Sequence, residues 1–338
     1  MNRAFWLLLT TAVVGSILGA GCLGEAPRDN PFDPGSDLFR NEGTVSGQVL
    51  RRDDTPIADV EVRLIPDSSR GGTVRVARTG SQGRFLFEGA PAATNYTLQA
   101  EKTNFSIAVR EALEVRAGES EEVPPLHLNA LPIFNEVAVR SLHISRWWPE
   151  DDLFFLEVTA EVSDADGLID LDRVWLDVPD LGFTVPLEAR SEGQFDQIIT
   201  ADSLPASNPQ ALLGRPLFLL AQDREGVMTQ SNALQLARII EETPVATSPK
   251  DRVLLTDNRP LFTWDPFVNR FPFTYRIDIF RTEVNRDVLV TQQDGFSMNT
   301  TTFQLQTSLE TGEYFWTVAV VDGFGNESRS KEAGFRVP

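Results

Sequence analysis

Residues 83–89 have the sequence GRFLFEG, and this stretch decides what kind of fold the surrounding chain can form. Two large aromatic side chains, Phe85 and Phe87, alternate with Arg84, Leu86 and Glu88. Successive side chains of a β-strand point to opposite faces, so the alternation predicts a strand that buries one face. Glycine at both ends is typical of turns. The stretch therefore predicts an antiparallel strand in a half-buried sheet.

The same period of two residues recurs on both sides of this strand. Its further apolar series are Val60, Val62 and Leu64, and Tyr96, Leu98 and Ala100. Runs rich in Gly, Pro, Asp and Ser separate the series at residues 53–56, 70–72 and 80–83. Short alternating strands with turns at such spacing predict an antiparallel β-sandwich over residues 44–128.

This segment resembles the carboxypeptidase regulatory-like domain. The matching runs are GTVSGQV at 43–49, TPIA at 55–58, GRFLFEG at 83–89 and YTLQA at 96–100. The family usually has Thr-Asp where this chain has Thr79-Gly80, which is a loop change. The resemblance implies a transthyretin-like sandwich of seven strands. It also implies a module without catalytic residues of its own, which stiffens or presents something else.

Residues 132–240 show the same alternation, with Phe154, Leu156, Val158, Ala160 and Val162 on one face of a strand. The segment has AQDREG at 221–226 before its last expected strand. This is similar to Ig-like repeats of bacterial surface proteins, in which Asp-x-x-Gly turns precede the final strand, so we expect an Ig-like sandwich. Later strands are expected around 174–178, 217–221 and 230–236. Residues 191–215 lack the period, and we expect a loop there with one short helix near 208–213.

Residues 239–249 are predicted to be a linker, and residues 244–338 resemble a fibronectin type III domain. PLFTW at 260–264 fits the early strand with a core tryptophan, Trp264. LETGEY at 309–314 fits the turn before a tyrosine corner at Tyr314. The predicted fold class is therefore all-β, with three tandem antiparallel β-sandwiches.

The N-terminal residues 1–21 have the pattern of a secretory signal peptide. Arg3 precedes an apolar run over residues 5–18, which is shorter than the ~20 residues of a membrane-spanning helix. Cys22, the single cysteine, follows directly. This junction resembles the lipobox of bacterial lipoproteins, although Gly19 stands where the family usually has leucine. The resemblance implies a diacylglyceryl group on the Cys22 thiol and cleavage just before it.

Residues 22–43 are rich in Pro, Gly, Asp and Asn, and this composition predicts a flexible tether. The lipid would attach the protein to the bacterial cell envelope, so the membrane is the one partner that the sequence names. Leu23 stands where some lipoproteins have an aspartate that retains them in the inner membrane. By this resemblance, we expect an outer-membrane location. Because Cys22 is used for lipid, the exported domains would fold without disulfides.

The net charge of −19 excludes nucleic acid as an expected partner, because phosphate binding needs a clustered basic face. The imbalance is concentrated between residues 132 and 240, where seven Lys and Arg face eighteen Asp and Glu. An acidic surface is also repelled by anionic lipid headgroups. Attachment is therefore predicted to occur through lipid rather than through a charged face.

The sequence offers little for catalysis. His127 and His143 are the only histidines, and both lie in strand-like alternation without a nucleophile motif or a metal-type spacing. We expect surface or sandwich-edge histidines, no cofactor and no enzyme activity. The predicted role is structural, adhesive or protein-binding, for an unidentified protein or glycan partner. The alternative is a carbohydrate-binding surface lipoprotein, which a planar row of exposed aromatic side chains would favour.

Two adjacent tryptophans, Trp147 and Trp148, end a predicted strand. Neighbouring side chains in a strand point to opposite faces, so one indole can enter a core while the other is exposed. An exposed indole can stack on a sugar or contact a protein partner. It can also pack against a neighbouring domain or loop, and both interpretations stay open.

Four aspartates, Asp164, Asp166, Asp170 and Asp172, lie within nine residues around Gly167. Crowded carboxylates repel one another, and calcium, which prefers six to eight oxygen ligands, is a natural counter-ion. The spacing is similar to part of the calcium loops repeated in extracellular proteins. The alternative is a solvated Asp-Gly turn between the strand that ends at Val162 and the strand that contains Val174.

Overall fold

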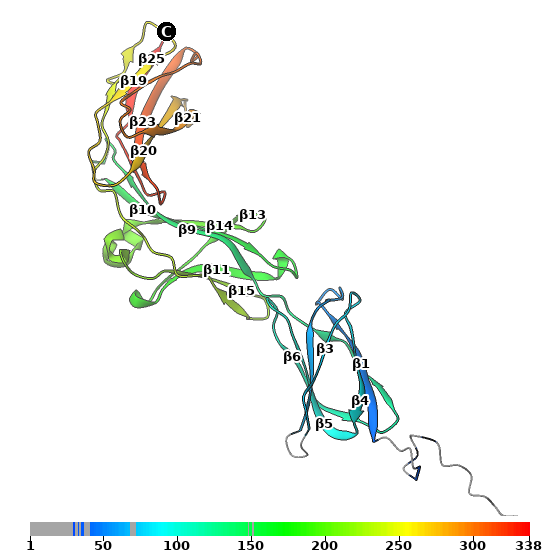
Figure 1. Cartoon of the computed structure of the whole chain (residues 1–338). Coiled ribbons are helices and arrows are strands. Elements are labelled where there is room, and N and C mark those ends of the chain that lie inside the picture. The colour runs from blue at the N-terminus through cyan, green and yellow to red at the C-terminus, as the bar shows by residue number, and fades with distance from the viewer. Residues whose placement is uncertain are drawn as a thin grey trace, which may run out of the picture. The chain divides into compact units, whose positions relative to one another are not determined.

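In a computed structural model, the chain folds mainly into β-strands (Figure 1). The described residues are 30, 33, 35–36, 41–67, 72–147, 149–150 and 152–338. The predicted signal peptide and Cys22 lie outside these residues. Among the described helices, which are all short 3₁₀ turns, none is long and apolar enough to span a membrane. The prediction of an all-β fold class is confirmed.

The chain divides into two compact units. The first unit consists of residues 1–49, 56–100 and 108–126, and the second of residues 50–55, 101–107 and 127–338. The segments 50–55 and 101–107 are therefore grouped with the second unit, although they lie between strands of the first in the sequence.

The first unit consists of two sheets, in which most strand pairs are antiparallel. One sheet has the order β4-β1-β7, with β8 also paired to β1, and the other has the order β3-β2-β5-β6. The strands are β1 (Glu42–Leu50), β2 (Glu61–Pro66), β3 (Arg75–Arg78), β4 (Arg84–Pro91), β5 (Ala93–Glu101), β6 (Ala108–Val115), β7 (Ser120–Glu122) and β8 (Leu126–His127).

The stretch GRFLFEG forms most of β4 and behaves as its alternation predicts. Phe85 and Phe87 are buried, while Leu86 between them is half exposed. Gly83 turns the chain into β4 with φ of +68°, and a Cβ atom there would lie 2.4 Å from the carbonyl oxygen of Val49. The glycine is therefore required by both the backbone angle and the close approach of β1.

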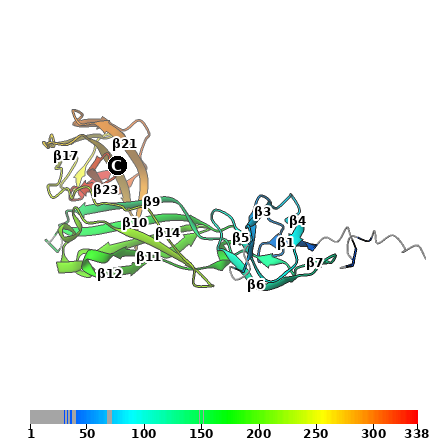
Figure 2. The same cartoon turned by 60° about the horizontal axis from the view of Figure 1, so that its bottom comes forward.

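The second unit begins with a sandwich of two sheets (Figure 2). The orders are β13-β14-β10-β9 and β12-β11-β15-β16. The strands are β9 (Ile133–Ile144), β10 (Leu153–Ser163), β11 (Leu171–Val178), β12 (Phe183–Pro186), β13 (Glu188–Ser191), β14 (Gln194–Thr200), β15 (Phe218–Asp223) and β16 (Met228–Gln230). The 3₁₀ turns are η1 (Leu168–Asp170), η2 (Pro179–Leu181), η3 (Ala201–Ser203), η4 (Pro205–Ser207) and η5 (Pro209–Leu212).

Two expectations for this sandwich are wrong. Residues 194–200 form β14 and pair with β10 from Phe155 to Glu161, instead of belonging to a loop. The last strand covers Met228–Gln230 instead of 230–236; beyond it, the chain makes one isolated bridge between Leu217 and Leu234. The short helical turn expected near 208–213 is present as η5.

The second unit ends with strands β17 (Ala246–Ser248), β18 (Val253–Leu254), β19 (Leu261–Trp264), β20 (Phe273–Thr282), β21 (Asp287–Ser297), β22 (Thr302–Gln304), β23 (Gly312–Asp322), β24 (Glu327–Arg329) and β25 (Ala333–Val337). Their core contains Phe262, Trp264, Tyr275 and Trp316. The phenol of Tyr314 donates a hydrogen bond to the carbonyl oxygen of Glu310 at 2.9 Å. The predicted core tryptophan and tyrosine corner are confirmed.

A single sheet passes through both parts of the second unit. The short strand β24 pairs with β23 on one side and runs parallel to β9 on the other, with Ser328 opposite His143. This pairing joins the strands into a ten-stranded sheet that runs from β13 to β21. The expected linker therefore does not separate two independent sheets.

The junction between β9 and β24 is polar and buried. Ser141 N–H donates to the side-chain oxygen of Asn326 at 3.0 Å, and the Asn326 amide group donates to Asp322. Arg238 forms an ion pair with the same Asp322 at 2.9 Å. Polar groups taken out of water need hydrogen-bond partners, so the pairing of β9 with β24 depends on these particular polar side chains.

His143 lies at the centre of this junction. It is 1% exposed and stacks on Phe154 with ring centroids 4.2 Å apart. Its Nδ1 lies 3.0 Å from the carbonyl oxygen of Ile240, and its Nε2 lies 3.1 Å from Asp152 Oδ2. His143 is therefore an internal polar contact of the sheet rather than a surface histidine.

Candidate functional site

The predicted calcium segment connects β10 to β11. The chain leaves β10 at Ser163, turns at Gly167 with φ of +99°, forms the 3₁₀ turn η1 and enters β11 at Leu171. A left-handed φ of this kind favours glycine. The turn carries Asp164 and Asp166 before the glycine, and Asp170 at the end of η1.

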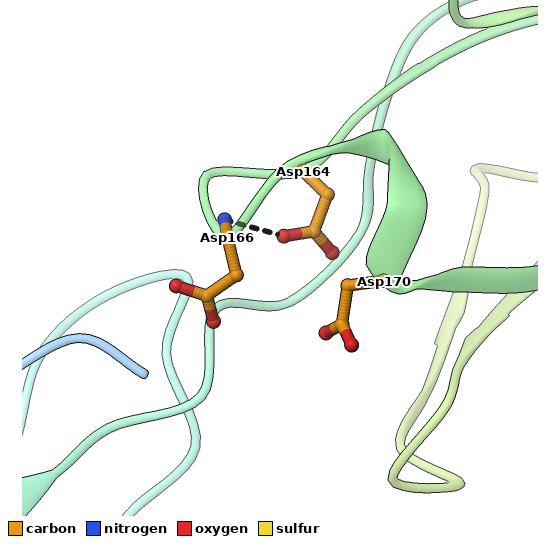
Figure 3. A group of neighbouring side chains, drawn as sticks. All are labelled: Asp164, Asp166 and Asp170. Atoms are coloured by element: carbon orange, nitrogen blue, oxygen red, sulfur yellow. Dashed lines mark hydrogen bonds between the residues drawn. The ribbon is translucent and has the colours of Figure 1, made fainter. Parts of the chain in front are cut away.

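Three of the four predicted carboxylates are brought together (Figure 3). Asp164, Asp166 and Asp170 each offer one side-chain oxygen, and these oxygens lie within 4.8 Å of one another. Asp172 is exposed on β11 and does not belong to this group. We call Asp164, Asp166 and Asp170 the acidic cluster.

Each carboxylate of the acidic cluster is oriented by a hydrogen bond to one of its oxygens. Asp164 Oδ1 accepts from the Asp166 N–H at 2.8 Å (Figure 3). Asp166 Oδ2 accepts from the Ala130 N–H at 2.6 Å. Asp170 Oδ1 accepts from the Arg52 guanidinium at 2.7 Å. The side chains are therefore held in place before any ligand arrives.

Residues distant in the sequence surround the acidic cluster within the second unit. Arg52 bridges Asp170 and Glu225, the latter at 2.8 Å. The Asn129 amide group donates to Asp223 Oδ2 at 2.6 Å. Sequence reasoning missed these neighbours, because nothing in the spacing of the aspartates indicates which remote segments cover them.

The electrostatic environment disfavours the charged form of Asp164. Burial raises the pKa of Asp164, and the negative charges of Asp166, Asp170 and Asp223 raise it further. The hydrogen bond from the Asp166 N–H opposes this rise in part. A carboxylate that is costly to ionise gains when a cation or a proton neutralises it.

The Trp147 side chain is exposed to solvent, but it contacts two residues of the same unit. Its Nε1 donates to the Glu332 carbonyl oxygen at 2.7 Å, and the Lys331 ammonium lies 4.6 Å from the ring centroid. The indole lines a groove of about 780 Å³ together with parts of 243–246, 250–252 and 330–336. Trp147 is still 64% exposed, so both interpretations of this indole stay predictions. Trp148 lies outside the described residues.

Exposed aromatic side chains do not form a row in the described residues. Trp147 and Phe324 are the exposed large aromatics there, and each has a cation near its ring, Lys331 and Arg238 respectively. The planar sugar-binding platform that would favour the carbohydrate alternative is therefore not seen in this part of the chain.

The two histidines lie in different surroundings. His127 is exposed and contacts Asp54 at 3.0 Å. His143 lies between Ser328 Oγ at 3.1 Å and Asp152, an order of residues that some hydrolases use. Ser328 is fully buried and its hydroxyl donates to the Glu242 carbonyl oxygen at 2.7 Å. This serine therefore belongs to the buried junction, and a substrate cannot reach its hydroxyl.

Solved structures similar to the chain are distant in sequence. The major pilin subunit BcpA of Bacillus cereus is 10% identical over 85% of this chain and 91% of its own, with a TM-score of 0.32. The FN1–FN3 domains of chicken CNTN1 are 11% identical over 88% and 98%, with a TM-score of 0.29. The fibronectin(III)-like modules of Clostridium thermocellum CbhA are 12% identical over 61% and 93%, with a TM-score of 0.28.

The comparison with curated proteins gave no match. Residues 44–128 match the model of the carboxypeptidase regulatory-like domain. The resemblance drawn from GTVSGQV, GRFLFEG and YTLQA is therefore confirmed for this segment, which contains the sandwich of the first unit.

Proposed function

We propose that the chain is a lipid-anchored envelope protein with a non-catalytic, structural role. It would hold binding surfaces away from the membrane on a tether that begins at Cys22. The pairing of β24 with β9 is the observation that carries this proposal. A spacer must resist bending, and one sheet that continues through both sandwiches of the second unit removes the hinge that a flexible linker would form.

The burial of polar groups supports the same role. Asn326, Ser328 and His143 are each no more than 1% exposed, and each has a partner across the junction. Separating the sandwiches would leave these groups without those partners, which costs free energy for each group. The joined state is therefore favoured over a pair of independently moving domains.

Rigidity can be measured by distances between spin labels. Cysteines placed at Glu188 on β13 and Val290 on β21, in a full-length Cys22→Ala background, mark the two edges of the ten-stranded sheet. We expect a narrow distance distribution. The same labels with Asn326→Ala and Ser328→Ala should give a broader one. A distribution that is already broad without those substitutions would contradict the proposed spacer.

Lipid attachment is tested separately in bacteria fed a clickable fatty acid. The wild-type chain should incorporate the label and fractionate with the outer membrane, whereas Cys22→Ala should not be labelled. Ser16→Ala, inside the apolar run, is the matched control and should be labelled normally. Equal labelling of the wild type and Cys22→Ala would show that the anchor proposal is wrong.

A further inference from the structure

Each aspartate of the acidic cluster has one buried side-chain oxygen without a hydrogen-bond partner. Asp164 Oδ2, Asp166 Oδ1 and Asp170 Oδ2 are buried and have no hydrogen-bond partner among the described residues. In each aspartate, the other oxygen is the one that holds the side chain in place. Buried oxygens without partners are rare in folded proteins, because each loses its bonds to water.

A fourth oxygen of the same kind comes from a neutral side chain. Asn129 is 4% exposed, and its Oδ1 is buried without a partner in the described part of the chain. Its amide nitrogen is bonded to Asp223, and the next residue, Ala130, donates to Asp166. The Asn129 amide therefore lies beside the acidic cluster, and repulsion between carboxylates does not explain its unpaired oxygen.

We propose that Asp164, Asp166, Asp170 and the side-chain oxygen of Asn129 bind one calcium ion. This inference goes beyond the proposed spacer role and does not depend on lipid attachment. One ion would give a partner to all four unpaired oxygens at once. Water molecules would complete the six to eight ligands that calcium takes.

The oxygens of the acidic cluster are close enough to share one ion, and their chemistry suits calcium. Two oxygens on opposite sides of a calcium ion lie ~4.8 Å apart, because each is ~2.4 Å from the ion. The ligand oxygens of the acidic cluster lie within 4.8 Å of one another, so they fit around one such ion. Magnesium usually keeps several of its water molecules and is bound by one or two carboxylates, so three carboxylates with an amide oxygen suit calcium better.

The local charge also requires a cation. Three carboxylates of the acidic cluster, Asp223 and Glu225 lie near only two guanidinium groups among the described residues. Arg52 pairs with Asp170 and Glu225, and Arg51 donates to the Ala165 carbonyl oxygen at 3.0 Å. Arg52 contacts Asp170 through Oδ1 and leaves Oδ2 free. The guanidinium and a calcium ion can therefore use the two oxygens of Asp170 together.

The ion would connect two segments of the second unit. The acidic cluster belongs to the connection between β10 and β11, whereas Asn129 and Ala130 precede β9. Calcium shared between Asn129 and the acidic cluster would fasten the start of β9 to this connection, in addition to the bond from the Ala130 N–H.

Calcium binding to the full chain, stripped with chelator, can be measured by isothermal titration calorimetry. We expect one calcium per chain with a Kd of ~10⁻⁴–10⁻³ M, as in extracellular modules. In scanning calorimetry, ~1 mM calcium should raise the Tm of the second unit by about 1–6 °C across this range of Kd, and magnesium at matched ionic strength should not.

The variants separate a calcium site from a simple turn. Asp164→Asn with Asp166→Asn should weaken calcium binding to a Kd above ~10⁻² M, while the protein stays folded because repulsion falls. Asn129→Ala should weaken it by about tenfold or more, the loss of one ligand. Asp172→Asn is the matched control and should bind like the wild type. Absence of calcium binding by the wild type, or binding that survives the double substitution, would overturn the proposal.

Discussion

The backbone N–H of Ser141 donates a hydrogen bond to the side-chain oxygen of Asn326 at 3.0 Å, across 185 positions of sequence. Asn326 is 1% exposed and also donates to Asp322 through its amide nitrogen. The Asn326 side chain is therefore hydrogen-bonded both to β9 and to the last residue of β23. The bond shows how closely the two sandwiches of the second unit depend on each other.

Asn326→Ala should lower the stability of the second unit by ~1–3 kcal/mol, because the Ser141 N–H is left buried without this acceptor. We also expect the unfolding of the two sandwiches to separate into two calorimetric transitions. Asn299→Ala, in an exposed turn of the same sandwich, is the control and should change neither quantity. A single unshifted transition in Asn326→Ala would contradict the importance of the junction.

Each of the three tyrosines has its phenol oxygen bonded to the backbone. Tyr96 donates to the Pro91 carbonyl oxygen at 2.8 Å in the first unit, and Tyr314 donates to that of Glu310 in the second. Either substitution by phenylalanine should cost ~1–3 kcal/mol. In urea unfolding, Tyr96→Phe should lower the midpoint of the first unit alone, and Tyr314→Phe should lower that of the second unit alone. Each variant is therefore the control for the other.

The two core tryptophans of the last sandwich differ in the hydrogen bonding of their indole nitrogens. The same substitution should therefore lower the stability by different amounts. Trp316 Nε1 donates to the Pro249 carbonyl oxygen at 2.7 Å. The Nε1 of Trp264 is buried without a partner among the described residues. Trp316→Phe should therefore cost ~1–3 kcal/mol more than Trp264→Phe. Trp264→Ala should cost ~3–5 kcal/mol by leaving a cavity. Equal costs for the two phenylalanine variants would show that the hydrogen bond is unimportant.

The raised pKa of Asp164 predicts a pH dependence in the absence of calcium. A carboxyl group with a raised pKa in the folded state contributes stability below its ordinary pKa of ~3.9 and loses that contribution as the pH rises through the folded value. Asp164→Asn cannot ionise, so its stability relative to the wild type should increase from about pH 4 toward neutrality.

The measurement is urea unfolding in chelator over that range, with Asp172→Asn as the exposed control. A stability difference between Asp164→Asn and the wild type that stays constant with pH would contradict the raised pKa.

The period of two residues was sufficient to predict the fold class but not every strand. β4 was predictable because Phe85 and Phe87 are both buried and both large. β14, with the sequence QFDQIIT, was missed because Ile199 is its one fully buried residue. β24 consists of Glu327, Ser328 and Arg329, which form no apolar pattern. Its pairing with β9 follows from partners elsewhere in the chain, which local sequence does not encode.

The acidic cluster was predictable in part for the same reason. The crowding of aspartates around Gly167 indicated that carboxylates would meet. Which ones meet depends on where η1 ends and β11 begins, because Asp170 closes the turn and Asp172 lies on the strand. Asn129 and Arg52 come from remote segments, and their types and spacing gave no signal that they would approach the acidic cluster.

The pairing of β9 with β24 also bears on aggregation. A strand at the edge of a sheet has unpaired N–H and C=O groups that can recruit a strand of another molecule. Here β24 pairs with Leu142 to Ile144 of β9, so each sandwich covers part of that edge of the other. Cutting the chain between the two sandwiches would uncover both edges at once. Fragments that end near residue 240 should therefore self-associate more readily than the intact second unit.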